Sequence, residues 1–207
     1  LLRDCLTRGL PALVEKPLGV VADLPALREL RPAVPVLVGY QLRFHSEIQR
    51  IRPLLSKAAA GILQCRCDSR TWPGSAGCGD FLGECSHEID LALACGAPPI
   101  VTFAASRDHN AELSLGAFCV SLSDRAEGYL RHWEWFDQPR GSYDVLYTSA
   151  AQYDADATVM YRDELAHFLR AVEGGPIAPG CTLEEGISVL DVVRQLKAIG
   201  KADRVEQ

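Results

Sequence analysis

The sequence has few of the features that suit a nucleic-acid-binding or membrane protein. Its 207 residues carry a formal net charge of −6, and no run of lysine or arginine supplies the basic face that a phosphate backbone needs. The longest apolar runs are far shorter than the roughly 20 residues that cross a bilayer. No signal peptide is visible. We therefore expect neither nucleic acid nor a membrane as a partner.

Metal-binding spacings are also scarce. The chain has eight cysteines, but they are irregularly placed and do not form the paired C-x₂₋₄-C knuckles of structural zinc sites. The stretch "HEID" at 87–90 begins like H-E-x-x-H, yet position 91 is leucine, so the second histidine ligand is absent. The candidate ligands that we weighed and set aside are Cys65, Cys67, Cys78, Cys85 and His87. We expect no metal, and reduced thiols in a cytoplasmic protein.

The sequence contains no G-x-G-x-x-G dinucleotide fingerprint. The nearest match is "GCGDFLG" at 77–83, which follows a Trp-Pro-Gly loop, whereas a pyrophosphate site needs a strand before the glycines and a helix after them. Loop glycines are the simpler interpretation. The chain also opens at Leu1, inside what reads as an amphipathic helix, so we expect a longer protein to extend upstream.

The chain does contain the pattern of a layered α/β unit at its start. Apolar residues make up 48% of the sequence and charged residues 23%, as in ordinary globular proteins. A helix is expected over residues 1–9, a strand over 12–15, a helix after Asp23 and a buried strand over 34–40. Strand, helix and strand joined by short links indicate a βαβ unit with parallel strands.

After residue 41 the pattern changes to an α+β domain. Helices are expected over 44–58 and 81–95, with a half-buried strand over 61–69 between them. Four strand-like segments follow at 99–106, 115–122, 126–135 and 141–149, which favours an antiparallel sheet. Two helices close the chain, over 161–172 and 182–200. The first carries an apolar stripe of Tyr161, Leu165, Phe168, Leu169 and Val172.

A candidate catalytic strip lies on the helix expected over 81–95. Glu84, His87 and Asp90 are spaced three residues apart and share one face of a helix with 3.6 residues per turn. The opposite face gathers the apolar residues Phe81, Leu82, Cys85, Ile89 and Ala92. A histidine between two carboxylates suits general acid/base catalysis, because its pKa lies near neutrality. A solvated polar face with an incidental histidine is the alternative.

Four motifs occur in an ordered set along the chain: "VEKPLG" at 14–19, "GYQLRF" at 39–44, "SHEIDLAL" at 86–93 and "YRDELAHFLRAVEGG" at 161–175. Together they resemble the Gfo/Idh/MocA family of NAD(P)-dependent oxidoreductases. The resemblance implies a Rossmann domain followed by an open, mostly antiparallel sheet with helices on one face. Residues 1–41 would then be the C-terminal remnant of the Rossmann domain, and residues 42–207 the substrate and oligomerisation domain.

The resemblance assigns catalytic roles to two residues. Lys16 matches the lysine beside the nicotinamide and the reacting sugar carbon, with Glu15 and Pro17 in the same cofactor-binding stretch. His87 matches the family's acid/base histidine, and Asp90 matches an orienting aspartate.

The same resemblance implies that Tyr40 and Arg43 line the cleft and contact cofactor or sugar, and that Glu84 replaces an acid usually found near the histidine. The chain also departs from the family pattern, because position 83 is glycine and Gln41 replaces a frequent asparagine.

The implied activity is hydride transfer between NAD or NADP and a sugar or sugar-nucleotide carbinol or ketone, in a homo-oligomer. The main alternative is a non-catalytic ligand- or partner-binding protein of the same fold, which the missing fingerprint and Gly83 favour. A hydrolase or lyase that uses NAD transiently is a third possibility.

Overall fold

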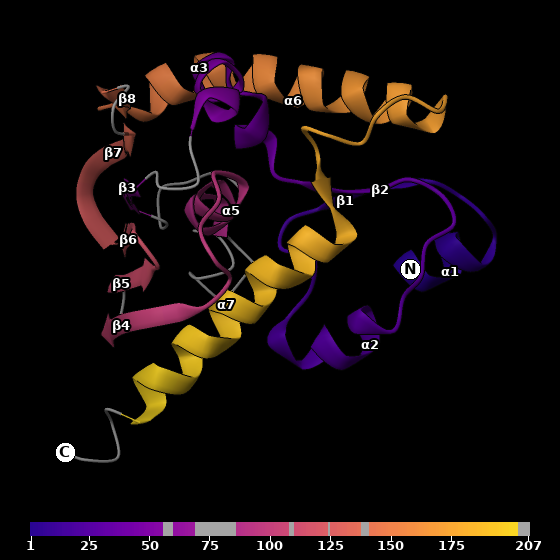
Figure 1. Cartoon of the computed structure of the whole chain (residues 1–207), viewed down its shortest axis with the longest axis horizontal. Coiled ribbons are helices and arrows are strands. Elements are labelled where there is room, and N and C mark those ends of the chain that lie inside the picture. Colours follow the sequence, from indigo (N-terminus) through magenta and orange to yellow (C-terminus); the bar gives the residue numbers. More distant parts are fainter. Residues whose placement is uncertain (56–59, 69–85, 108–109, 124, 138–140, 203–207) are drawn as a thin grey trace.

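The chain forms two sheets joined by helices in a computed structural model that describes residues 1–55, 60–68, 86–107, 110–123, 125–137 and 141–202. A six-stranded sheet stands on one side and a three-stranded sheet on the other (Figure 1). The long helix α6 (Ala150–Val172) crosses the top of this view, and α7 (Leu183–Ala202) runs diagonally between the two sheets. Residues from both parts belong to one hydrophobic core.

The small sheet contains the predicted strand–helix–strand unit. After α1 (Leu2–Thr7), strand β1 (Ala12–Glu15) pairs in parallel with β2 (Val36–Gly39), and η1 (Val21–Asp23) and α2 (Leu24–Arg28) lie between them in sequence. All four residues of β2 are buried. A third strand, β9 (Cys181–Thr182), pairs antiparallel with β2. The small sheet therefore draws on the C-terminal part of the chain as well as on residues 1–41, a contribution that local sequence patterns do not reveal.

The chain crosses to the large sheet through short helical segments. These are η2 (Gln41–Phe44), α3 (Ser46–Ile51) and η3 (Arg52–Leu54), where a single helix over 44–58 was predicted. Strand β3 (Ala60–Asp68) follows. Pro53 lies in the first turn of η3, and it lacks the N–H that would continue the preceding helix.

The large sheet has the order β4-β5-β6-β3-β7-β8, and its pairs are antiparallel except that β3 and β6 run in parallel. The remaining strands are β4 (Val101–Arg107), β5 (Asn110–Leu115), β6 (Phe118–Ser123), β7 (Arg125–Asp137) and β8 (Gly141–Tyr147). The mostly antiparallel sheet is as predicted. The segment 115–122 was predicted as one strand, but Gly116 adopts φ +60° and turns the chain, so that Leu115 ends β5 and Phe118 begins β6.

Helix α5 (Ser86–Ala94) lies between the large sheet and α7. Residues 86–92 are all buried, so His87 and Asp90 of the strip expected to be polar are enclosed, as are Ile89 and Ala92 of the face expected to be apolar. Charged side chains at this depth need partners. The partners come from segments distant in sequence, which is why the helix's own pattern did not predict the burial of every residue from 86 to 92.

The apolar stripe predicted on α6 faces outward. Tyr161, Leu165, Leu169 and Val172 are 45%, 50%, 55% and 43% exposed. The buried face instead includes the polar residues Glu164 and His167, together with Tyr153, Ala157, Met160 and Ala171. The inward face of α6 therefore borders polar groups, and a count of apolar residues selected the wrong face.

The first test concerns the contact between α7 and β2. At Gly186 an added Cβ would lie 2.7 Å from Cγ2 of Val38, a β-branched side chain with little freedom to move. We expect Gly186→Ala to lower the free energy of unfolding by about 1–3 kcal/mol, despite alanine's higher helix propensity. Urea unfolding measures this change. Glu184→Ala on the exposed side of α7 is the control, and stabilisation by Gly186→Ala would contradict the packing described.

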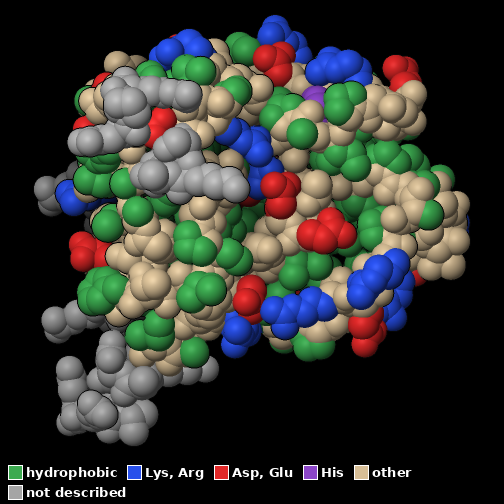
Figure 2. Space-filling view, viewed as in Figure 1, with side chains coloured by type: hydrophobic (Ala, Val, Ile, Leu, Met, Phe, Trp, Pro, Cys, Tyr) green, Lys and Arg blue, Asp and Glu red, His purple; other side chains and the backbone are tan. Residues whose placement is uncertain are grey.

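In the described ranges no helix is both long and apolar enough to cross a bilayer. Acidic and basic side chains are interspersed on the face of the molecule in Figure 2.

Candidate functional site

Lys16 lies at the carboxyl edge of the small sheet. Glu15 is the last residue of β1, in register with Gly39 of β2, and Pro17 follows Lys16 through a cis peptide bond. Pro17 has no N–H to extend the ladder, so the strand ends here. Glu15 is exposed, whereas Lys16 and Pro17 are half-buried. Carboxyl edges of parallel strands are where open α/β sheets bind ligands.

His87 lies in the first turn of α5 and is 3% exposed. The ring of Tyr40 meets it edge-on, with 5.5 Å between the ring centroids, and the Tyr40 hydroxyl donates to Oγ of Ser86 over 3.2 Å. Nδ1 of His87 is buried and has no hydrogen-bond partner. Burial, followed by the positive charges of Lys16 and Arg131, lowers the pKa of His87 well below 6.5. The imidazole is therefore neutral near pH 7, and its Nδ1 atom can bind a further ligand.

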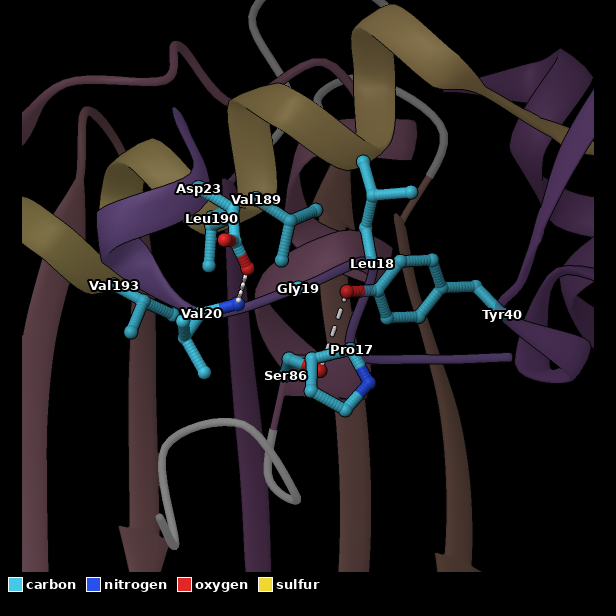
Figure 3. Close-up of a pocket in the computed structure, with 10 residues that line it drawn as sticks. All are labelled: Pro17, Leu18, Gly19, Val20, Asp23, Tyr40, Ser86, Val189, Leu190 and Val193. Carbon is cyan, nitrogen blue, oxygen red and sulfur yellow. Dashed lines mark hydrogen bonds between the residues drawn. The ribbon is translucent and has the colours of Figure 1, made fainter. Parts of the chain in front are cut away.

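Lys16 follows strand β1 of the small sheet, whereas His87 is on α5, which packs against the large sheet. The two residues are close enough for the charge of Lys16 to lower the pKa of His87. Their sequence neighbours also meet. Pro17, Tyr40 and Ser86 line one cavity of about 310 Å³, whose remaining wall comes from the loop after β1 and from α7 (Figure 3). The fold thus brings the carboxyl edge of β1 near the start of α5, although neither Lys16 nor His87 is among the residues that line this cavity.

Arg43 and Asp90 are paired with each other. Nε and Nη2 of Arg43 donate to the Asp90 carboxylate over 2.9 and 2.7 Å, and Nη1 donates to Glu185 over 2.9 Å. Arg43 is 1% exposed and Asp90 0%. The structure therefore places Arg43 in the interior between Asp90 and Glu185, and its predicted contact with cofactor or sugar stays a prediction. The pair ties η2 to α5 and α7, so Asp90 acts on His87 only through the helix that both share.

Glu84 and Gly83 lie outside the described residues. Their predicted places beside His87 stay predictions.

Gln41 is a site residue that the sequence presented only as a departure from a family pattern. Its Nε2 donates to the hydroxyl oxygens of Tyr153 and Tyr161 of α6 over 3.2 and 3.0 Å. Its Oε1 is buried without a hydrogen-bond partner. Gln41 directly follows Tyr40, and that adjacency to the motif was the available signal.

Glu164 adds a buried carboxyl on the inward face of α6. It is 3% exposed, and burial, followed by the negative charges of Glu15 and Asp90, raises its pKa to about 8. The carboxyl is therefore largely protonated near pH 7. It adds little negative charge to the region that Glu15 and Lys16 share.

Arg131 of β7 and Glu88 of α5 form a second buried pair. Arg131 Nε lies 3.0 Å from Oε1 of Glu88, and their side chains are 6% and 0% exposed. The guanidinium stacks over the ring of Tyr153 at 4.6 Å. Burial raises the pKa of Glu88 to about 8, although the Arg131 charge opposes this. Sequence reasoning missed both residues because they meet only when β7 lies against α5.

In the part of the chain that the structure describes, no group of three or more histidine, cysteine, aspartate or glutamate side chains is placed to hold a metal ion.

Comparisons with known proteins identify the fold. No family model and no curated protein matches the sequence. Among solved structures, a myo-inositol dehydrogenase from Lactobacillus casei in complex with NAD(H) and myo-inositol matches with a TM-score of 0.70 and 11% identity, covering 97% of this chain and 71% of that one.

Two further structures match to a similar extent. A UDP-N-acetylglucosamine 3-dehydrogenase from Acidithiobacillus ferrooxidans matches with a TM-score of 0.67 and 21% identity over 97% of this chain and 73% of that chain. A dehydrogenase from Chromobacterium violaceum has a TM-score of 0.73 and 13% identity over 98% and 73%. The chain thus has the fold of Gfo/Idh/MocA-type dehydrogenases, and the predicted resemblance is confirmed at the level of fold.

Proposed function

We propose that this chain is an oxidoreductase that moves a hydride between a nicotinamide cofactor, NAD or NADP, and a carbinol or ketone of a sugar or sugar nucleotide. The observation that supports the proposal is that Lys16 and His87 come close enough for their charges to interact. They are distant in sequence, yet the Lys16 charge contributes to the lowered pKa of His87. The fold shared with sugar and sugar-nucleotide dehydrogenases supports the same function.

His87 is the proton acceptor in the oxidation direction. Its neutral imidazole takes the proton from the carbinol hydroxyl as the carbonyl forms, and returns it in the reverse reaction. Lys16 holds the same oxygen through its ammonium group and stabilises the negative charge that develops there. The positive charge that makes His87 a weaker base also favours ionisation of the hydroxyl, so the two effects offset each other.

Tyr40 positions the base. Its ring packs edge-on against the imidazole while its hydroxyl is held by Ser86, so the ring of His87 has a fixed orientation. Arg43 and Asp90 fix α5 itself. A proton acceptor whose orientation is set before the substrate binds loses less entropy on reaching the transition state.

The residues present suit one end of a dinucleotide. Bound nicotinamide would supply the hydride acceptor, and the stretch Glu15–Pro17 lies at a carboxyl edge of the kind where such ligands bind. The glycine-rich turn that binds a pyrophosphate through backbone N–H groups is not in the sequence. The residues present therefore fit the nicotinamide end of the cofactor, and they do not supply a pyrophosphate site of the usual kind.

This partial fit leads to a prediction on affinity. We expect the 207-residue chain to bind NAD(H) or NADP(H) only weakly, with a dissociation constant above the micromolar range, because the pyrophosphate lacks its donors. Calorimetric titration measures this constant. Micromolar affinity would show that the chain holds the pyrophosphate by a different element.

The function itself is tested by hydride transfer at saturating, millimolar cofactor. A panel of hexoses and nucleotide sugars is incubated with the chain and with NAD⁺ or NADP⁺, and reduced nicotinamide is followed by absorbance. We expect turnover with at least one carbinol, and its loss in His87→Ala. Sugar binding without hydride transfer would favour the non-catalytic binding protein, which the absent fingerprint supports.

A further inference from the structure

His45 lies where the chain passes from the small sheet to the large one. It follows η2 and caps α3, because its Nδ1 atom accepts the backbone N–H of Glu47 over 3.2 Å. On the other side of the ring, Nε2 lies 2.6 Å from the hydroxyl oxygen of Tyr147, and that hydroxyl donates to Oδ2 of Asp156 over 2.6 Å. One buried imidazole thus connects the start of α3 with β8 and α6.

These hydrogen bonds determine the protonation state of the ring. A ring nitrogen that accepts a hydrogen bond carries no proton, so Nδ1 is unprotonated while it caps α3. The single proton of the neutral ring is then on Nε2, which donates to the Tyr147 oxygen, and the Tyr147 proton points to Asp156. A second proton has only Nδ1 to bind, where it would meet the N–H of Glu47. The cap therefore requires a neutral ring.

The environment of His45 keeps the ring neutral near pH 7. Burial lowers the pKa of His45 below 6.5, although the carboxylates of Asp156 on α6 and Glu47 on α3 oppose this. Asp156 is 57% exposed, and Glu47 is paired with Arg50 at 2.6 Å, so solvent and a neighbouring cation weaken both carboxylates. The net effect places proton binding on the acid side of 6.5.

Two aromatic rings enclose the imidazole on the sheet side. Trp133 of β7 and Tyr147 of β8 meet it edge-on, with ring centroids 5.7 and 5.9 Å from its own. Neither ring carries a charge near pH 7, so neither offsets the charge that His45 gains when it binds a proton. A protonated ring therefore has the Asp156 carboxylate to stabilise it on the Nε2 side and a repelling N–H on the Nδ1 side.

We propose that His45 is an acid-sensitive switch that holds the start of α3 in place only while its imidazole is neutral. Nδ1 takes one proton from solvent, the Glu47 N–H loses its acceptor, and the first turn of α3 opens. The contact between α3 and η2, where Gln49 donates to the carbonyl oxygen of Arg43, weakens with it. The switch is independent of the proposed function, since no cofactor or substrate takes part in it.

The test follows two NMR signals of the full chain between about pH 7 and pH 5, on either side of the ordinary histidine pKa. The Cε1–H shift of His45 reports proton binding. The hydrogen-exchange protection of the Glu47 amide, corrected for the intrinsic pH dependence of exchange, reports the cap. We expect protection to fall by about tenfold, the usual effect of losing a side-chain N-cap. Both signals should share one midpoint, below pH 6.5.

Three variants assign the response to His45. His45→Asn keeps a good N-cap acceptor that does not titrate in this range, so we expect constant protection of the Glu47 amide. Asp156→Asn removes a charge that favours protonation, so the midpoint should move to lower pH. His132→Asn is the matched control and keeps the wild-type response, because His132 points to the opposite face of the sheet from Trp133.

Three results overturn the inference. Unchanged protection of the Glu47 amide while His45 titrates shows that the cap does not depend on the charge of the ring. A pH response that persists in folded His45→Asn assigns it to another group. A His45 ring that binds no proton above about pH 5 shows that no switch operates in the range around the ordinary histidine pKa. The two wild-type results stand even if His45→Asn fails to fold.

Discussion

Replacing His87 with alanine is expected to lower turnover of a carbinol substrate by about 10²–10⁴-fold, the usual contribution of a positioned acid/base. KM should change little, because the variant removes a proton acceptor and leaves Lys16 to hold the substrate oxygen. Steady-state kinetics at saturating cofactor measure both constants. The matched control is His132→Ala, since His132 is on β7 one residue from Arg131 and so points to the opposite face of the sheet. Equal loss in both variants would contradict the role of His87.

The pH dependence of stability provides a second test of the environment of His87. The pKa of His87 is lowered well below 6.5 by burial and by the charges of Lys16 and Arg131. At a pH between the lowered pKa of the folded chain and about 6.5, His87 binds a proton in the unfolded chain and not in the folded chain. The free energy of unfolding therefore falls as pH drops below about 6.5. We expect His87→Ala to weaken this acid-side loss in urea unfolding between pH 7 and 5. An unchanged pH dependence would indicate that His87 is protonated in the folded state.

Replacing Arg43 with methionine is expected to lower the free energy of unfolding by about 3–5 kcal/mol, because Asp90 would stay buried without its partner. The pair is 1% and 0% exposed and its shortest contact is 2.7 Å. Three elements depend on it, since Arg43 also donates to Glu185 and to the carbonyl of Gly180. Urea unfolding with far-ultraviolet circular dichroism measures the loss.

Two variants separate the buried pair from charge in general. Arg43→Met combined with Asp90→Asn should recover part of the stability, because no buried charge is then left alone. Arg50→Met removes the ion pair with Glu47 on the surface of α3, and we expect almost no change from it. A loss in Arg50→Met as large as in Arg43→Met would contradict the importance assigned to burial.

Local pattern was sufficient to predict the two layers of this fold, but not the bounds of every element. The parallel pair β1 and β2 follows from an apolar run and the turn and cap residues around it, and the mostly antiparallel large sheet follows from consecutive short strands. The parallel contact of β3 with β6 was not predictable. It joins segments separated by α5 and a hairpin, and no local signal encodes such a partner.

The same limit applies to the site. The ordered motifs identified Lys16 and His87, and their neighbourhood follows from the fold. The motif identified Arg43 as a candidate site residue, but a motif does not show that its side chain is buried against Asp90. Arg131 and Glu88 were missed because buried charges are recognised by their partners, which tertiary structure alone supplies. The outward orientation of the apolar stripe on α6 was not predicted for the same reason. The inward face of that helix carries the polar residues Glu164 and His167, whose surroundings only the tertiary structure supplies.

The central claim is that Lys16 and His87 serve one hydride-transfer site. The most direct measurement uses a sugar deuterated at the oxidised carbinol carbon, incubated with the chain and excess NAD⁺ or NADP⁺, with mass spectrometry of the reduced cofactor. Our account predicts one deuterium on the nicotinamide ring in wild type and His132→Ala, and far less in His87→Ala. Deuterium transfer that persists undiminished in His87→Ala, or a bound sugar that never loses its deuterium, would contradict it.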